Sequence, residues 1–257
     1  PILLLNGLIL ALTAMAIAQN IGLTRDKEVA RLETIADLKS RRITEWLGNR
    51  EQDLRQILDN PSYGALSLSG QRDRPSDEQT QRLIEFISVR GFDGAALFDR
   101  TGQALWQTPG ASIMNATLRD ALTRATAGKV LRVGPYLDEQ GQTRFDFLTP
   151  LATAAGPAPI IVLQISGSHW VNQILNPWPI PDSSGEATLF RQRADQVQYL
   201  SDLRYRPDSA LRLHLPLHHD TLLAAQYLRL DAGQRGPRVL SGKDYRDMAA
   251  FGVVYPV

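Results

Sequence analysis

The sequence predicts an α+β protein in which a long N-terminal helix precedes two units of β-hairpins and short helices. Residues 1–24 carry no charge, and a helical pattern continues through residues 25–59 without a proline. Beyond residue 61, short apolar strands alternate with short helices, and the order of these elements occurs twice. A long helix followed by a duplicated α/β unit is therefore the expected architecture.

The composition excludes several classes of function. The 257 residues carry a formal net charge of +1, which provides no overall field for attracting nucleic acid, so no nucleic-acid partner is expected. The chain has no cysteine, which rules out thiolate metal sites, iron–sulfur clusters, disulfides and a cysteine nucleophile. Serine-hydrolase, zinc-protease, Walker and dinucleotide-binding motifs do not occur. We therefore expect this segment to be no enzyme and to hold no cofactor.

Residues 1–24 are interpreted as a transmembrane anchor. About 20 helical residues span the roughly 30 Å hydrocarbon core of a bilayer. A cleaved signal peptide is the first alternative, because Ala16-Ile17-Ala18 resembles a small-x-small cleavage site. A buried helix of a soluble protein is the second alternative. The helical pattern runs past the cleavage site without a turn, which favours a retained anchor, and the first two interpretations both place the later residues outside the cytoplasm.

Residues 25–60 are predicted to form a long connecting helix. Apolar residues recur in steps of three and four, which is the pattern of one helical face. A coiled-coil spacer would explain such a stripe, and part of it is expected to face a partner helix. The stripe is wider than a coiled-coil seam around Trp46-Leu47 and Ile57-Leu58, which favours additional packing against a globular unit.

Five elements are predicted between residues 76 and 166. Residues 76–90 begin with a capping box and continue as a helix. Residues 94–108 and 129–151 are expected to form hairpins, because a glycine-containing turn separates two short apolar runs in each. Residues 115–127 are predicted to form a helix, and residues 159–166 to form a buried strand.

The second half of the chain repeats this order. Matched segments are 97–106 with 189–199, 115–127 with a helix starting at Asp220, and 134–151 with 236–257. Each match alone is weak, but their shared order indicates an internal duplication. The first copy has a further strand at 159–166, and the second has no counterpart. We therefore expect the second unit to lack its last strand.

This organisation resembles the double Cache sensor domains of bacterial receptors, which consist of two PAS-like units. The resemblance covers residues 25–257 and extends to the stretches ADLKSRRITEWLGNR, NPWPIP and GKDYRD. It is closest to the Cache modules of membrane histidine kinases and diguanylate cyclases. It implies a membrane-distal unit at residues 61–167, a membrane-proximal unit at 168–257, and a central antiparallel sheet in each with the last strand lying centrally. It also implies that a ligand binds mainly in the distal unit.

Candidate ligand-binding residues are polar or aromatic side chains on the predicted strands of the distal unit. They are Phe98, Asp99, Trp106, Arg132, Tyr136, Asp138 and Asp146. A cation and carboxylates around an apolar cavity suit an organic acid, a small zwitterion or another small metabolite. Arg132 and Tyr136 are expected to project from one strand face. Other roles are open for most of this set, since Asp99 and Asp138 adjoin turns and Phe98 and Trp106 suit a core.

The residue set of amino-acid-binding Cache sensors is matched in one element. Tyr136-Leu137-Asp138 fits its tyrosine-x-aspartate element, but residues 111–128 lack the tryptophan and tyrosine of the set. The last strand has Gln164 and Ser166 where the set has an aspartate. The resemblance therefore argues against an amino-acid ligand of the usual kind and favours a turn at Asp138.

A metal site is not expected. His218-His219-Asp220 is the cluster that comes nearest to one, but adjacent histidines on an extended segment point to opposite sides. Asp220 occupies the place expected of a helix N-cap.

The sequence thus predicts a ligand-sensing input domain of a transmembrane receptor in the bacterial inner membrane. Residues after about 25 would lie in the periplasm or outside the cell, and a homodimer about the long helices would relay ligand binding in the distal unit. Two alternatives remain, a structural or protein-interaction spacer without a small-molecule ligand and a secreted hydrolase. The type of output domain lies outside these residues.

Overall fold

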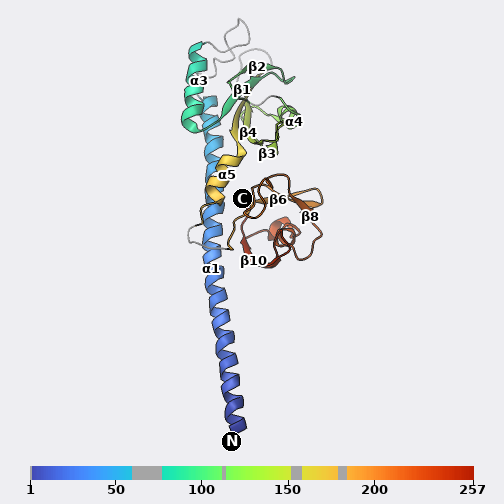
Figure 1. Cartoon of the computed structure of the whole chain (residues 1–257). Helices are drawn as coiled ribbons and strands as arrows, with labels where there is room; N and C mark the ends of the chain where they lie inside the picture. The colour runs from blue at the N-terminus through green and yellow to red at the C-terminus, as the bar shows by residue number, and fades with distance from the viewer. Residues whose placement is uncertain (1, 60–76, 112–113, 152–157, 179–183) are drawn as a thin grey trace. The chain divides into compact units, whose positions relative to one another are not determined.

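A computed structural model describes residues 2–59, 77–111, 114–151, 158–178 and 184–257 (Figure 1). Its contacts divide the chain into two units. One unit contains residues 1–42, 192–197 and 215–257, and the other contains residues 43–191 and 198–214. The predicted boundaries at residues 60–61 fall outside the described residues, and those at 167–168 stay a prediction.

The predicted long helix is confirmed as one continuous element, α1 (Ile2–Asp59). Its apolar stripe is buried at Ile43, Leu54 and Ile57, while Leu38 is 45% exposed. The wide stripe therefore marks globular packing, as the sequence predicts. Within the part of the chain that the structure describes, no helix combines the length and the apolar character needed to cross a membrane.

The larger sheet has five antiparallel strands. They are β1 (Gly94–Phe98), β2 (Ala104–Gln107), β3 (Leu131–Leu137), β4 (Thr143–Pro150) and β5 (Ile160–Ser166). Their order is β2-β1-β5-β4-β3, so the last strand in the chain is the central one, as the resemblance implies. β5 is almost entirely apolar and buried, which suits a strand covered on both faces.

Three further helices belong to this part of the chain. They are α3 (Asp77–Arg90), α4 (Ala116–Arg124) and α5 (Gly167–Leu175). The first two confirm the helices predicted over 76–90 and 115–127, although α4 ends earlier than expected, and Ser76 of the capping box lies outside the described residues. The sequence analysis did not anticipate α5.

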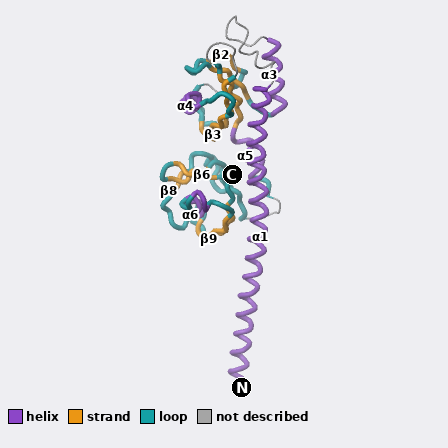
Figure 2. Tube along the Cα trace, turned by 180° about the vertical axis from the view of Figure 1, so that it is seen from behind, coloured by secondary structure: helices purple, strands orange, loops and turns teal. Residues whose placement is uncertain are grey.

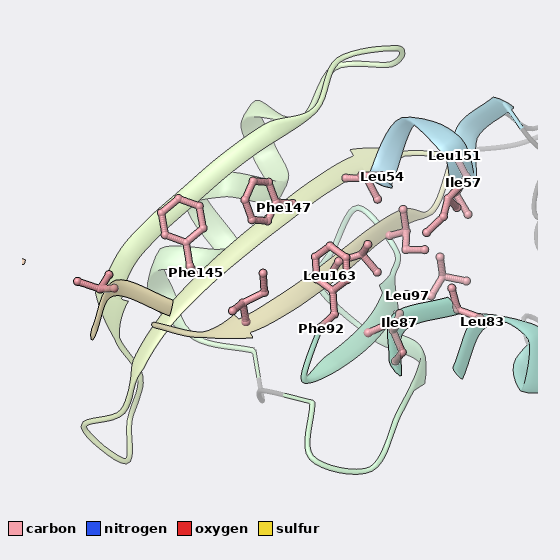
Figure 3. Packing of buried hydrophobic residues seen from close by; sticks show 14 of the residues in the cluster. Leu54, Ile57, Leu83, Ile87, Phe92, Leu97, Phe145, Phe147, Leu151 and Leu163 are labelled. Carbon is pink, nitrogen blue, oxygen red and sulfur yellow. The ribbon is translucent and has the colours of Figure 1, made fainter. Parts of the chain in front are cut away.

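Side chains alternate between the two faces of the five-stranded sheet. One face packs against α1 and α3, and Phe147, Leu163 and Leu97 point from it toward Leu54 and Ile57 (Figure 3). The other face packs against α4 and contains a second apolar cluster. Its fully buried members include Phe98, Leu118, Leu148 and Val162.

The remaining elements are shorter and alternate with loops (Figure 2). They are β6 (Phe190–Arg193), β7 (Gln196–Tyr199), β8 (His214–Pro216), α6 (Leu223–Leu228), a 3₁₀ turn (Ala232–Gln234), β9 (Arg238–Lys243) and β10 (Ala249–Val254). The two hairpins that the repeat predicts in this half of the chain, within residues 189–199 and 236–257, are present as β6-β7 and β9-β10. Instead of one central sheet, however, the described residues form a three-stranded sheet, β6-β7-β8, and a separate hairpin, β10-β9.

The helix expected from Asp220 begins later than predicted. Its N-cap is Leu222, which makes no capping hydrogen bond from its side chain. Asp220 instead pairs with Arg229 at 2.6 Å. The N-cap lies two residues after Asp220, so the expected N-cap role of Asp220 is wrong.

Candidate functional site

A polar cluster lies within the apolar face that α4 covers. Tyr136 on β3 donates a hydrogen bond to Asp146 Oδ2 on β4 at 2.5 Å. Asn115, directly before α4, donates from Nδ2 to the Tyr136 hydroxyl at 3.3 Å. We call these three residues the Tyr136–Asp146 cluster. It joins two neighbouring strands to the start of a helix.

Asn115 is held in place by its role as the N-cap of α4. Its backbone is extended, and its side-chain oxygen accepts a hydrogen bond from the Leu118 amide at 2.9 Å. Asparagine is among the best residues for this position because its oxygen satisfies one of the free amides of the first turn. The same side chain thus starts the helix and points its amide nitrogen at Tyr136.

The double role of Asn115 gives a prediction for stability. Asn115→Ala should lower the free energy of unfolding by about 1 kcal/mol, since the cap of α4 is lost. Asn115→Asp should retain most of the cap while removing the donor to Tyr136. Urea denaturation of both variants would show this order, and Thr117→Ala, at an exposed position of the same turn, should change little. Equal losses for both Asn115 variants would contradict the capping role.

Asp146 is a carboxyl group in an apolar environment. Its exposed fraction is 0%. Its Oδ1 has no hydrogen-bond partner among the described residues. Burial raises the pKa of Asp146 to about 7, although the hydrogen bond from Tyr136 and the charge of Arg144 act in the opposite direction. Burial and the neighbouring carboxylate also raise the pKa of Tyr136. A buried, partly unsatisfied carboxyl is costly to fold, so it calls for a functional explanation.

The sheet register places Asp146 opposite Gln164 of the central strand β5. Gln164 is, with Ser166, one of the two positions at which the resemblance implies the aspartate of the amino-acid-binding set. A carboxyl group, that of Asp146, thus lies on the strand next to this position, directly across the ladder.

Asp138 and Asp99 serve as turn residues. Asp138 accepts hydrogen bonds from the amides of Gln140 and Gln142 and pairs with Arg144 at 2.8 Å. Burial favours its neutral form, but the Arg144 guanidinium and the two amides outweigh this and lower the pKa of Asp138. Asp99 accepts from the amides of Thr101 and Gln103 in the same way. The turn role expected at the tyrosine-x-aspartate element is thus confirmed.

Arg132 and Tyr136 do not project from one face, contrary to the sequence-based expectation. The strand register shifts between Val133 and Tyr136, so the simple alternation of side chains fails there. Arg132 forms an ion pair with Glu51 of α1 at 2.7 Å. Tyr136 packs in the cluster on the α4 face.

The other predicted site residues divide between the two faces. Phe98 is part of the apolar cluster beside Tyr136 on the α4 face. Trp106 is half-buried and packs against the cluster on the α1 face. The structure therefore brings Phe98, Tyr136 and Asp146 together and places Trp106 and Arg132 elsewhere. Asn115 and Gln164 were absent from the predicted set, although a polar Gln164 inside an apolar strand is a signal in the sequence.

A groove of about 860 Å³ lies in the unit that contains residues 1–42, 192–197 and 215–257. It is lined by Ile17, Ile21 and Arg25 of α1 and by Gly242, Ala249 and Phe251 of β9 and β10, among others. The groove is open and mainly apolar, and its lining includes no buried, unpartnered carboxyl group. We therefore place the candidate site at the Tyr136–Asp146 cluster.

A metal site receives no support from the residues that the structure describes, which contain no group of three or more potential ligand side chains. The Nδ1 atom of His219 lies 3.4 Å from the hydroxyl oxygen of Thr221.

Comparison with known proteins identifies the fold. No family model matches the sequence, and no curated protein matches it significantly. Among solved structures, the ligand-binding domain of the Pseudomonas fluorescens chemoreceptor CtaA in complex with L-serine aligns with a TM-score of 0.55 at 15% identity, covering 85% of this chain and 86% of that one. The chain has a double Cache fold.

A second chemoreceptor shares this double Cache fold. It is the ligand-binding domain of the Pseudomonas aeruginosa amino acid chemoreceptor PctC in complex with GABA. The alignment has a TM-score of 0.53 at 17% identity and covers 84% of this chain and 88% of that one. The CtaA domain in complex with L-leucine aligns with a TM-score of 0.53 at 15% identity, and the alignment covers 86% of this chain and 85% of that one. The predicted resemblance is therefore confirmed at the level of the fold.

Proposed function

We propose that the chain is the extracytoplasmic, ligand-sensing input domain of a transmembrane receptor, and that its ligand contacts the Tyr136–Asp146 cluster. The observation that carries this proposal is the buried Asp146 carboxyl group, one of whose oxygens has no hydrogen-bond partner in the described residues. A fold used by chemoreceptor ligand-binding domains supports the sensory role. The output module would be a histidine kinase or a diguanylate cyclase.

The charge of the cluster favours a ligand with an ammonium group. The acidic Asp146 lies at its centre, while Arg132 is paired with Glu51 and Arg144 with Asp138. Among the described residues of the cluster, an organic acid would find no unpaired cation, so we propose an ammonium compound rather than the organic acid that the sequence suggests. L-serine and GABA, which the CtaA and PctC domains bind, each carry an ammonium group and a carboxylate. Asp146 provides a partner for the ammonium group only, which is why simple amines are part of the proposed ligand class.

Attachment to the inner membrane through residues 1–24, with the later residues in the periplasm, is part of the proposal. The large apolar side chains described in this part of α1 are more than half exposed, as expected for a surface that lipid covers. They include Ile9, Leu10, Leu12, Met15 and Leu23, whereas Ile17 and Ile21, equally exposed, line the groove beside β9 and β10. A homodimer about α1 would supply the two states that signalling across a membrane requires.

A thermal-shift screen tests the ligand proposal. The full chain is titrated with amino acids, simple amines, organic acids and purines. A ligand at one hundred times its Kd should stabilise the protein by about 2.7 kcal/mol. We expect stabilisation by ammonium compounds, and its loss in Asp146→Asn but not in the control Asp99→Asn, whose carboxylate belongs to a turn. Stabilisation by no compound would favour the spacer alternative.

The pH dependence of binding gives an independent check. An ammonium group pairs with the ionised form of Asp146, so a proton competes with the ligand below about pH 7. The affinity should then fall by up to about tenfold for each pH unit below this value. Calorimetric titration between pH 5 and pH 8 measures this slope, and a flat profile would remove Asp146 from the ligand site.

A further inference from the structure

The carbonyl group next to Tyr136 is bound by a distant arginine. Arg191 on β6 donates from Nη2 to the Pro135 carbonyl oxygen at 3.1 Å. The Nε atom of Arg191 also donates to Gln198 Oε1 at 2.9 Å. One guanidinium group thus joins the strand that carries Tyr136 to a residue of β7, and its planar shape fixes the direction of both bonds.

Gln198 continues the connection toward the loop before β8. Its side chain is 1% exposed, and its amide nitrogen donates to the Leu211 carbonyl at 2.9 Å. The same nitrogen lies 3.1 Å from His214 Nε2. Hydrogen bonds therefore run from Pro135 through Arg191 and Gln198 to residues 211–214. All of these residues belong to the unit that contains residues 43–191 and 198–214. Gln198 and Leu211 are buried, and Arg191 and His214 are half-buried. Consecutive hydrogen bonds polarise one another, so a change in one bond alters the strength of the next.

The Pro135 carbonyl lies at the irregular point of β3. The ladder with β4 pairs Val133 with Asp146 and Tyr136 with Arg144, and the two residues between them have no cross-strand partner. Gly134 there has a φ of +118°, and an added Cβ would lie 2.8 Å from the Arg144 carbonyl oxygen. Tyr136 itself is paired in the ladder, whereas the Pro135 carbonyl directly before it accepts the hydrogen bond from Arg191.

Few charged groups face the Tyr136–Asp146 cluster. In the described part of the chain, Asp146 is influenced by Tyr136 from β3, by Arg144 on its own strand and by Asp138, the partner of Arg144. The central strand β5 presents Gln164 opposite Asp146, and α4 presents its cap Asn115. The charged side chains of α4, which include Arg119, Asp120 and Arg124, are exposed.

We propose that Arg191 is the positioning residue that couples the state of the Tyr136–Asp146 pair to the segment Gln198–His214. A ligand or a proton on Asp146 alters the hydrogen bond from Tyr136, and Tyr136 is covalently joined to the carbonyl that Arg191 binds. This inference rests on the proposed function in so far as the Tyr136–Asp146 pair is the ligand site. Coupling between two sites is reciprocal, so a change at Arg191 must also change proton binding at Asp146.

The proton serves as the probe, because no ligand needs to be known. Arg191→Lys keeps the charge and removes the two-pronged hydrogen bond. Arg193→Lys is the matched control, since Arg193 lies on the same strand, β6, at an exposed position outside the segment Gln198–His214. The full chain, labelled with ¹³C in the aspartate carboxyl groups, is titrated by NMR, and the Asp146 signal is assigned from its absence in Asp146→Asn.

We expect Arg191→Lys to raise the midpoint of the Asp146 titration by 0.5 pH unit or more, about a threefold change in proton affinity. Loss of the bond to Pro135 loosens Tyr136, whose hydrogen bond stabilises the carboxylate. Arg193→Lys should leave the midpoint unchanged. An unchanged midpoint in folded Arg191→Lys, or an equal shift in Arg193→Lys, would overturn the coupling. Gln198→Asn, which shortens the next link, provides the same test if Arg191→Lys does not fold.

Hydrogen exchange distinguishes this proposal from the proposed function. The protection of amides 198–214 against exchange, relative to their intrinsic exchange rate at each pH, should change around the Asp146 midpoint in the unmodified chain and stay constant in Asp146→Asn. Identical protection in the two proteins at every pH would overturn the coupling even if ammonium ligands bind. The absence of any ligand in the thermal-shift screen would overturn the proposed function and leave the NMR and exchange results to decide the role of Arg191.

Discussion

Asp146→Asn is expected to make the protein more stable at pH 8 and to remove much of the pH dependence of its stability. The folded-state pKa of Asp146 is about 7, whereas an exposed aspartate has a pKa of about 3.9. Between these values the folded protein binds more protons at this position than the unfolded chain does. The free energy of unfolding must then fall as the pH rises.

The size of the effect follows from the same shift. The contribution of Asp146 to stability is fully present below about pH 4 and is lost as the pH rises to about 7. Each pH unit in this window can cost up to about 1.4 kcal/mol. An asparagine cannot ionise and can still accept the hydrogen bond from Tyr136. We therefore expect a gain of about 2–4 kcal/mol at pH 8 and almost none at pH 4, measured by urea denaturation.

Asp138→Asn should behave in the opposite way. The pKa of Asp138 is lowered, so its ionised form stabilises the fold above the ordinary aspartate range and its contribution is lost as the pH falls below about 4. This variant should be less stable than the unmodified chain at pH 8, because Arg144 loses its anionic partner.

Parallel pH profiles for Asp146→Asn and the unmodified chain would show that Asp146 does not titrate in this range. A stabilising substitution at a buried carboxyl is also what a functional site predicts, since function tolerates a local cost in stability.

The elements that the sequence predicts well depend on local signals. The hairpins turn at Gly102 and Gly141, both with positive φ, where glycine avoids the steric cost of a side chain. Asn115 begins α4 by capping it, and the stripe on α1 follows a period that only a helix satisfies. These features need no knowledge of distant residues. The central position of β5 followed from the resemblance and not from periodicity.

The features that the sequence missed depend on contacts distant in the chain. Nothing local reveals that Arg132 pairs with Glu51, eighty-one residues earlier, because the ion pair requires α1 to lie beside β3. The irregular register between Val133 and Tyr136 reverses the face on which Tyr136 lies relative to Arg132. A period-two argument cannot anticipate such a bulge.

The candidate site was therefore only partly predictable. Tyr136 and Asp146 were both candidates, but their partnership depends on the pairing of β3 with β4 and on the bulge between Val133 and Tyr136. Asn115 was visible as a helix start, and its second role toward Tyr136 needs the packing of α4 on the sheet. The cation expected at the site was wrongly placed for the same reason. An ion pair across elements, unlike a turn, leaves no signature in the neighbouring residues.

The attachment of α1 to the sheet gives the second large expected effect. Leu54 is fully buried, with an exposed fraction of 0%, and belongs to the cluster that includes Phe147 and Leu163 (Figure 3). Leu54→Ala should lower the free energy of unfolding by about 2–5 kcal/mol, because it removes buried methyl groups and leaves a cavity that rigid aromatic neighbours cannot fill. Urea denaturation at neutral pH measures this loss.

Leu38→Ala is the matched control on the same helix. Leu38 is 45% exposed, so the same substitution should change stability by about 0.5 kcal/mol or less. Any intrinsic effect of alanine on helix formation is common to both variants, and the difference between them isolates the packing of α1 on the sheet.

If α1 relays the state of the Tyr136–Asp146 cluster, Leu54→Ala should also reduce the response of the helix to a ligand. Leu54 packs on the sheet face opposite the one that carries the cluster. Equal losses for the two variants would contradict this attachment, and α1 would then have to be held by its polar contacts, such as the ion pair of Glu51 with Arg132.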